Sequence, residues 1–235
     1  MNRIKLLSTV MLSGLIAAAN AQDKKPTLYP AMAPVEQYLM ASKDEIAMAR
    51  SAAPPSISSD AKVLVLGKHG YETAVPGKNG FVCFVMRSWT AGIDDDVNFW
   101  NPKIRGPNCF NPPAVRSVLP QYLRRTEWVL AGIGRPQINE KAKAGFASHQ
   151  FVPPDVGSYS FMLSKLGYLG DGPAGPWYPH VMFFVGPGRT ADWGADLEAS
   201  PIMSGDFSPY EPAILYVPVP HWSDGSAAPA PPMGH

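Results

Sequence analysis

The sequence predicts an α+β fold in which an antiparallel sheet packs against two or three helices, with many loops between them. Three observations support this prediction. Short apolar runs that are typical of strands occur in both halves of the chain. Two longer stretches, 35–50 and 115–130, place apolar residues on one helical face and can cover such a sheet. The 26 Pro and 21 Gly residues among 235 indicate frequent turns and few long elements.

The first 21 residues have the pattern of a secretory signal peptide. Arg3 and Lys5 precede an apolar run over residues 6–18, and Ala19-Asn20-Ala21 provides a small-residue cleavage site. The apolar run is shorter than the roughly 20 residues that a membrane-spanning helix needs. We therefore expect an exported chain, periplasmic or extracellular, that begins at Gln22 and has no membrane span after cleavage.

One helix and three strands are expected in the first half of the mature chain. Pro34 fits the first turn of a helix whose apolar residues recur at steps of three and four, and Pro54-Pro55 ends it. The strands are expected at 62–67, 70–74 and 80–87. Because the turns between them are tight, they favour an antiparallel meander.

The second half is expected to contain two helices, three strands and a tail. Pro120 either kinks the helix at 115–130 or marks its true start, and a shorter helix follows at 137–147. The strands are expected at 159–166, 181–185 and 213–219. The Ala/Pro-rich residues 223–235 show no periodicity and are expected to be a disordered tail. Residues 22–222 then form a single domain.

The two cysteines indicate a disulfide. Cys83 lies in the third expected strand, and Cys109 lies at the far end of the irregular segment 89–113. An even pair in an exported protein favours a bridge, and two buried free thiols are the alternative. Loops as long as 89–113 are usually functional or held by a cross-link. Zinc is not indicated, because neither Cys has a Cys or His at ligand spacing.

Composition excludes several partners. Charged residues make up 17% and hydrophobic residues 46%, which argues against intrinsic disorder. The formal net charge is +1, and loss of Arg3 and Lys5 with the signal peptide leaves the mature chain close to neutral. We therefore expect no nucleic-acid partner and no attraction to an anionic membrane.

Motifs that fix a reaction are missing. The chain has no G-x-S-x-G, H-x-x-x-H or H-E-x-x-H string. Asp94-Asp95-Asp96 lacks the spacing, the Gly and the terminal Glu of an EF-hand and is interpreted as an exposed acidic turn. Pro173 and Pro176 follow the Gly-rich run 167–172, which favours a turn over a phosphate site. We expect neither a metal ion nor a cofactor.

Aromatic, histidine and acidic residues gather in loops beside the C-terminal strands. The candidate ligand-binding residues are Asp171, Trp177, Tyr178, His180, Trp193, His221 and Trp222. Aromatic faces with a few polar groups can bind a small molecule, a glycan or a peptide. In the alternative interpretation the Trp rings cover the core and the histidines are scattered.

Two geometric expectations follow for these residues. The first is that Asp171, Trp177 and His180 line one partly exposed pocket. The second is that His180 and His221 lie at opposite edges of the sheet if their strands are antiparallel neighbours.

Six short segments of the sequence carry a resemblance to other proteins. They are Ile46–Pro54, Val63–Leu66, Gly77–Cys83, Trp100–Cys109, Gly167–Asp171 and His221–Gly225. Together they resemble a family of uncharacterised exported bacterial proteins over most of the mature chain. The resemblance implies export but no established activity, so it transfers no catalytic residue. Relatives carry extra His around residues 177–180, where this chain has Tyr178, which weakens a metal-binding role there.

Two functions remain open at this point. The first is a non-enzymatic binding or structural protein of the envelope, favoured because no nucleophile, acid–base pair or metal motif stands out. The alternative is an envelope hydrolase, which could depend on a metal ion, using His180, Asp171 and His221.

Overall fold

The computed structural model describes residues 28–90, 98–170, 178–206 and 208–229. The predicted signal peptide lies outside these residues. Within the described ranges, no helix is both long enough and apolar enough to cross a membrane.

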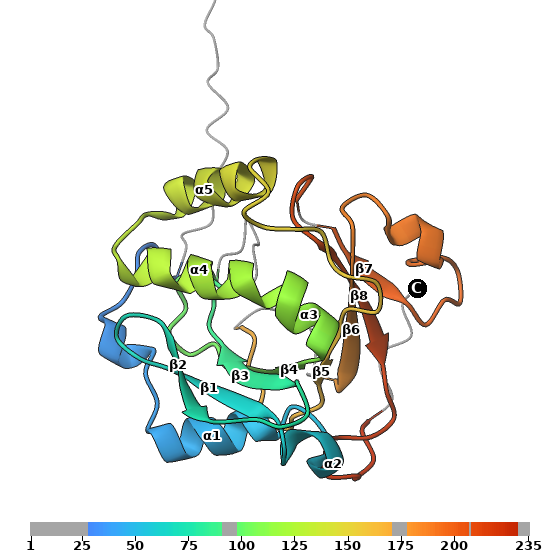
Figure 1. Ribbon diagram of the computed structural model, residues 1–235. Coiled ribbons are helices and arrows are strands. Elements are labelled where there is room, and N and C mark those ends of the chain that lie inside the picture. The colour runs from blue at the N-terminus through green and yellow to red at the C-terminus, as the bar shows by residue number, and fades with distance from the viewer. Residues whose placement is uncertain (1–27, 91–97, 171–177, 207, 230–235) are drawn as a thin grey trace, which may run out of the picture.

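In the described part of the chain, eight strands form one mixed, mostly antiparallel sheet in the order β2-β1-β3-β4-β5-β6-β8-β7 (Figure 1). Their bounds are β1 Lys62–Leu66, β2 Tyr71–Val75, β3 Val82–Met86, β4 Gly106–Phe110, β5 Tyr159–Met162, β6 His180–Val185, β7 Met203–Gly205 and β8 Ala213–Pro218. The α+β class is confirmed. The sheet is larger than predicted, since the sequence pattern did not indicate β4 and β7.

The predicted meander of the first three strands is wrong. β1 pairs with β2 antiparallel and with β3 parallel, so β1 lies between them. The connection after β2 returns past the start of β1, where Lys78 N donates to Asp60 O and Lys62 N donates to Phe81 O. At Gly77 a Cβ would lie 2.2 Å from Lys62 N, so the two backbones touch there. This return path brings β3 to the free side of β1.

The lower face of the sheet is covered by α1 (Ser42–Arg50), with α2 (Pro55–Ser58) at its end (Figure 1). The predicted helix 35–50 is broken: a 3-10 turn, η1 (Val35–Gln37), precedes α1. Ala41, just before α1, is extended, with φ −61° and ψ 131°. The carbonyl of Tyr38 accepts a hydrogen bond from Arg87 Nε at 2.7 Å, which ties the end of η1 to the residue after β3.

The upper face is covered by α3 (Pro112–Ser117) and α4 (Leu119–Leu130), and α5 (Arg135–Ala147) packs on α4 (Figure 1). Pro120 stands in the first turn of α4, so the second of its two predicted roles is confirmed. Phe110 of β4 joins the layers, with Tyr122 of α4 and Phe84 of β3 at ring-centroid distances of 5.5 and 5.3 Å.

The predicted disulfide is confirmed, but its setting differs from the prediction. Cys83 and Cys109 are bonded and stand directly opposite each other in the antiparallel pair β3–β4. Cys109 is therefore part of a strand and does not end a loop, and the supposed irregular segment 89–113 contains β4. Both cysteines are buried beneath α1.

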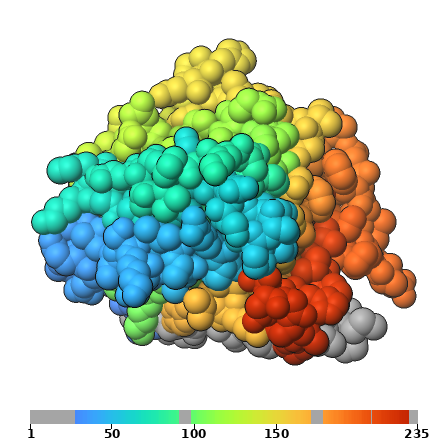
Figure 2. Space-filling view, turned by 60° about the horizontal axis from the view of Figure 1, so that its bottom comes forward, coloured from blue at the N-terminus to red at the C-terminus, as the bar shows by residue number. Residues whose placement is uncertain are grey.

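The described chain continues past the predicted domain end at residue 222. Trp222 N donates to Ser226 O, and Ser223 N donates to Leu163 O, each at 2.9 Å. These bonds hold residues 221–228 in a turn against the end of β5. Figure 2 shows these C-terminal residues, in red, next to the region of α2. The last residues of the predicted tail, 230–235, lie outside the described residues.

Candidate functional site

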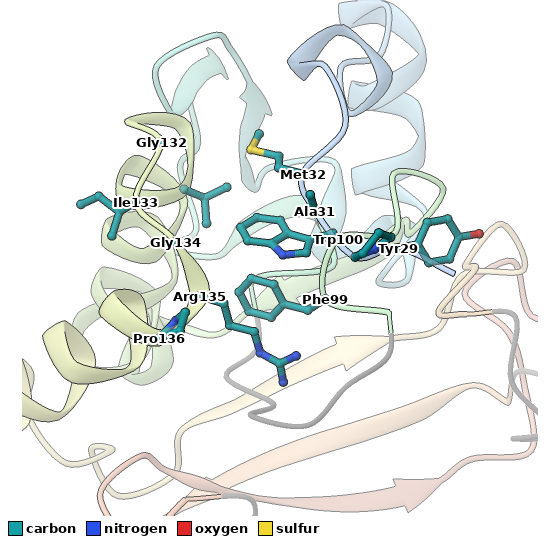
Figure 3. Close-up of a pocket in the computed structure, with 12 residues that line it drawn as sticks. Tyr29, Ala31, Met32, Phe99, Trp100, Gly132, Ile133, Gly134, Arg135 and Pro136 are labelled. Carbon is teal, nitrogen blue, oxygen red and sulfur yellow. The ribbon is translucent and has the colours of Figure 1, made fainter. Parts of the chain in front are cut away.

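A cleft of about 510 Å³ lies between three separate segments (Figure 3). It is called the aromatic cleft below. Its walls are Tyr29–Met32, Phe99, Trp100, Val129 and Gly132–Pro136. The first segment precedes η1, the second precedes β4, and the third is the connection from α4 to α5. The volume falls within the roughly 300–1,000 Å³ that is usual for small-molecule sites.

The α4–α5 connection forms a defined corner of the aromatic cleft. Gly132 has φ +80°, a conformation that favours glycine, and Ile133 N donates back to Trp128 O at 3.0 Å. Gly134 then caps α5, and Pro136 in its first turn fixes the start of the helix. Backbone geometry therefore places Arg135 at the wall.

A single hydroxyl joins the other two walls. The buried Tyr38 donates to Trp100 O at 2.8 Å and accepts from Ala33 N at 3.1 Å. Burial raises the pKa of Tyr38, which keeps the hydroxyl protonated at neutral pH. Tyr38 thus holds the segment before η1 and the Phe99–Trp100 pair at a fixed separation.

Aromatic rings and one cation form the inner surface of the aromatic cleft. The rings of Phe99 and Trp100 meet edge to face at 4.6 Å, and Arg135 Cζ lies 4.9 Å from the Phe99 centroid. Figure 3 shows the two rings side by side, facing the α4–α5 connection, with the Arg135 side chain passing Phe99. Such a surface suits a flat apolar group that carries negative charge.

Another cavity, of about 140 Å³, contains one of the predicted site residues and is called the His180 cavity below. It lies under α4, where β3 and β5 end and β6 begins. Its lining is Met86, Arg87, Ser88, Asn98, Ile104, Tyr122, Met162, Leu169, His180, Met182, Ile214 and Tyr216. Its volume is close to that of a roughly 150 Å³ cavity known to accept benzene.

The titratable rings of the His180 cavity are uncharged at neutral pH. The pKa of His180 is lowered, chiefly because the ring is buried. Burial also raises the pKa of Tyr216 to about 12 and raises that of Tyr122 further. The His180 and Tyr216 rings meet edge to face at 5.6 Å. The cavity therefore offers neutral hydrogen-bonding groups among apolar walls.

The structure brings together only part of the predicted site. Asp171 and Trp177 lie outside the described residues. Of the three residues predicted to line one pocket, the structure therefore places only His180. Tyr178 contributes its carbonyl, which accepts from His180 Nδ1 at 2.9 Å. Of the predicted site residues that the structure describes, His180 lines the His180 cavity.

The expected separation of His180 and His221 is wrong. β6 and β8 are antiparallel, and His180 pairs with Pro218. His180 begins its strand while His221 follows the end of the other, and antiparallel neighbours bring such positions to the same edge. Trp222 lies at this edge as well. His221 is exposed and is not among the residues that line the His180 cavity.

Trp193 lies away from these residues. It belongs to η2 (Thr190–Trp193), which follows the end of β6 and contacts β8. That end of β6 pairs with Ala213, at the edge of the sheet opposite to His180. The side chain of Trp193 is half exposed. Of the candidate residues that the structure describes, Trp193 therefore lies apart from His180, His221 and Trp222.

Sequence reasoning missed the aromatic cleft. Tyr29, Phe99 and Arg135 are far apart along the chain, and only folding brings them together. One signal was present, because Phe99 and Trp100 stand in the segment 89–113, whose length suggested a functional loop. Among the described residues, no three His, Cys, Asp or Glu side chains gather as metal ligands would.

No known protein family, curated protein or solved structure matches this chain.

Proposed function

We propose that this chain is an exported binding protein without enzymatic activity. Its ligand is a small anionic molecule with a flat apolar body, and the site is the aromatic cleft. One observation carries the proposal: a cation, Arg135, lies against an edge-to-face aromatic pair, Phe99 and Trp100, in a cleft of about 510 Å³. The Cys83–Cys109 bond supports the export part, because disulfides persist in oxidising compartments.

The ligand class follows from the chemistry of the cleft. Aromatic walls favour flat apolar groups, and a guanidinium pairs well with carboxylate or sulfonate. The start of α5 lines the same cleft, and a helix N-terminus favours negative charge. Tyr38 holds two walls in place before binding, which lowers the ordering cost.

The hydrolase alternative receives less support. It relies on Asp171, His180 and His221, of which Asp171 lies outside the described residues. Because His221 does not line the His180 cavity, the two histidines do not share that site.

The proposal is tested with a matched pair of probes, indole-3-acetate and its neutral amide. Mature protein is titrated with each probe by calorimetry. We expect saturable binding of one equivalent and a preference for the carboxylate. Arg135→Gln should abolish this preference, and Trp100→Ala should weaken binding of both probes at least tenfold.

Arg116→Gln is the matched control, because Arg116 is an exposed arginine that pairs with Asp155 away from the cleft. This variant should bind as the unaltered protein does. Unchanged carboxylate preference in Arg135→Gln, or absence of saturable binding, contradicts the proposal. Melting temperatures of the free variants show whether a lost affinity reflects a lost fold.

A further inference from the structure

The His180 cavity contains an unusual concentration of sulfur. Of the ten Met residues in the chain, three line this one cavity together with His180. Met162, the last residue of β5, pairs directly with His180, the first residue of β6. Met182 is two positions further along β6, so it lies on the same face of the sheet as His180.

Met86 reaches the same place from β3 because of a glycine. Met86 pairs with Gly106, and a Cβ at Gly106 would lie 3.1 Å from Met86 Cε. The missing side chain lets Met86 extend across β4 toward β5. The buried Asn108 of β4 donates from Nδ2 to Met86 Sδ at 3.5 Å, which locates this sulfur over β4. The register of β4 with β5 puts Asn108 next to Met162.

His180 has the orientation of a metal ligand. Its Nδ1 lies 2.9 Å from the carbonyl of Tyr178, and a carbonyl only accepts, so Nδ1 carries the proton and Nε2 the lone pair. Metal-bound histidines regularly donate their second ring N–H to a backbone carbonyl in this way.

We propose that the His180 cavity binds one soft monovalent metal ion, Cu(I) or Ag(I), through the thioethers of Met86, Met162 and Met182 and through Nε2 of His180.

The donor set selects this class of ion. Thioethers are soft, neutral ligands that favour Cu(I), whereas calcium and magnesium take oxygen ligands and structural zinc takes thiolate or imidazole. Among the described residues that line the cavity none carries a carboxylate, which favours an ion of low charge. The rings of Tyr122 and Tyr216 also line the cavity, and aromatic faces attract cations.

Arg87, the one charged residue in the described part of the lining, does not oppose a cation. Its guanidinium bonds to Glu45 Oε1, to the Tyr38 carbonyl and to the Val85 carbonyl. Because Glu45 belongs to α1, these bonds direct the charge to the other face of the sheet. On that face the carboxylate of Glu45 compensates the positive charge of Arg87.

The first experiment measures Cu(I) affinity. Mature protein is titrated without oxygen against the chromogenic Cu(I) chelator bicinchoninate, with ascorbate to keep copper reduced. We expect one tightly bound equivalent. The near-isosteric variant Met162→Leu/Met182→Leu should lose affinity at least a hundredfold. Met203→Leu is the matched control, because Met203 is exposed on β7 and should leave binding unchanged.

A second measurement needs no variant. Protein labelled with ¹³C at the methionine methyl groups is titrated with Ag(I), which has no redox chemistry under these conditions. Three methyl resonances should shift together and stop at one equivalent. X-ray absorption of the copper form should show three sulfur neighbours and one nitrogen.

Several outcomes would overturn the proposal. Among them are absence of stoichiometric Cu(I) binding, equal affinity in the double variant, and shifts confined to exposed methionines. Copper bound only by nitrogen and oxygen also contradicts it. His221→Ala separates a surface imidazole from the site, and loss of the tight equivalent in that variant counts against the cavity.

Discussion

The carboxylate of Glu45 and the guanidinium of Arg87 form an ion pair, Oε1 to Nη2 at 2.8 Å, and both side chains are completely buried. The same oxygen accepts from Leu66 N at 3.1 Å. Arg87 also donates to the Tyr38 carbonyl, beside the aromatic cleft. The pair therefore connects α1, the end of η1, β1 and the end of β3.

We expect Glu45→Gln to destabilise the fold strongly. Removing one partner leaves the charge of Arg87 buried without compensation, which lowers the free energy of unfolding by roughly 3–5 kcal/mol. Urea denaturation followed by tryptophan fluorescence measures the change. Glu127→Gln is the matched control, since Glu127 pairs with Arg124 at the surface and such pairs contribute about 1 kcal/mol at most. Equal effects of the two variants contradict a structural role for the buried pair.

The disulfide is expected to stabilise the sheet without forming it. Cys83→Ala/Cys109→Ala should lower the free energy of unfolding by roughly 2–5 kcal/mol. Because β3 and β4 also pair over their full length, the variant should keep its circular dichroism spectrum below its melting temperature. Thiol titration of the native, unaltered protein should find no reactive cysteine. A stable protein with two free thiols would show that the bond does not form.

The burial of His180 leads to a prediction about how the free energy of unfolding depends on pH. Burial lowers its pKa in the folded state, so the folded protein binds fewer protons at this site than the unfolded chain. Stability from this site is therefore complete above the unfolded pKa of about 6.5 and decreases as the pH falls below it. Unfolding is measured in urea at pH 7.5 and at pH 5.

The variant His180→Gln provides the comparison for this prediction. It should lose less stability between the two pH values than the unaltered protein, because the titrating group is gone. His221→Gln removes an exposed histidine and should keep the original difference. If His180→Gln and the unaltered protein respond identically, another group causes the pH dependence.

Local patterns predicted the elements better than their arrangement. Pro120 marks the start of α4 because proline suits a first helical turn, which is a local property. Glu45 is different: a carboxylate in a helix is expected at the surface, and its burial depends on Arg87, which is distant in sequence. The aromatic cleft is missed for the same reason, since Phe99 and Arg135 meet only in the folded chain.

The parallel pairing of β1 and β3 leads to the last prediction, at Gly77. A Cβ at this position would lie 2.2 Å from Lys62 N and 2.8 Å from the carbonyl carbon of Ala61, and neither backbone atom can move without disturbing β1. Gly77→Ala should therefore displace the return path that brings β3 beside β1, with a loss of several kcal/mol, among the largest effects of single substitutions. Gly186→Ala is the matched control, because a Cβ there would meet only Arg189 Cγ, at an ordinary 3.6 Å. Urea denaturation of both variants tests the prediction, and near-ultraviolet circular dichroism reports the packing of the aromatic core. If Gly77→Ala is as stable as Gly186→Ala, the two backbones do not pass each other as closely as this topology requires.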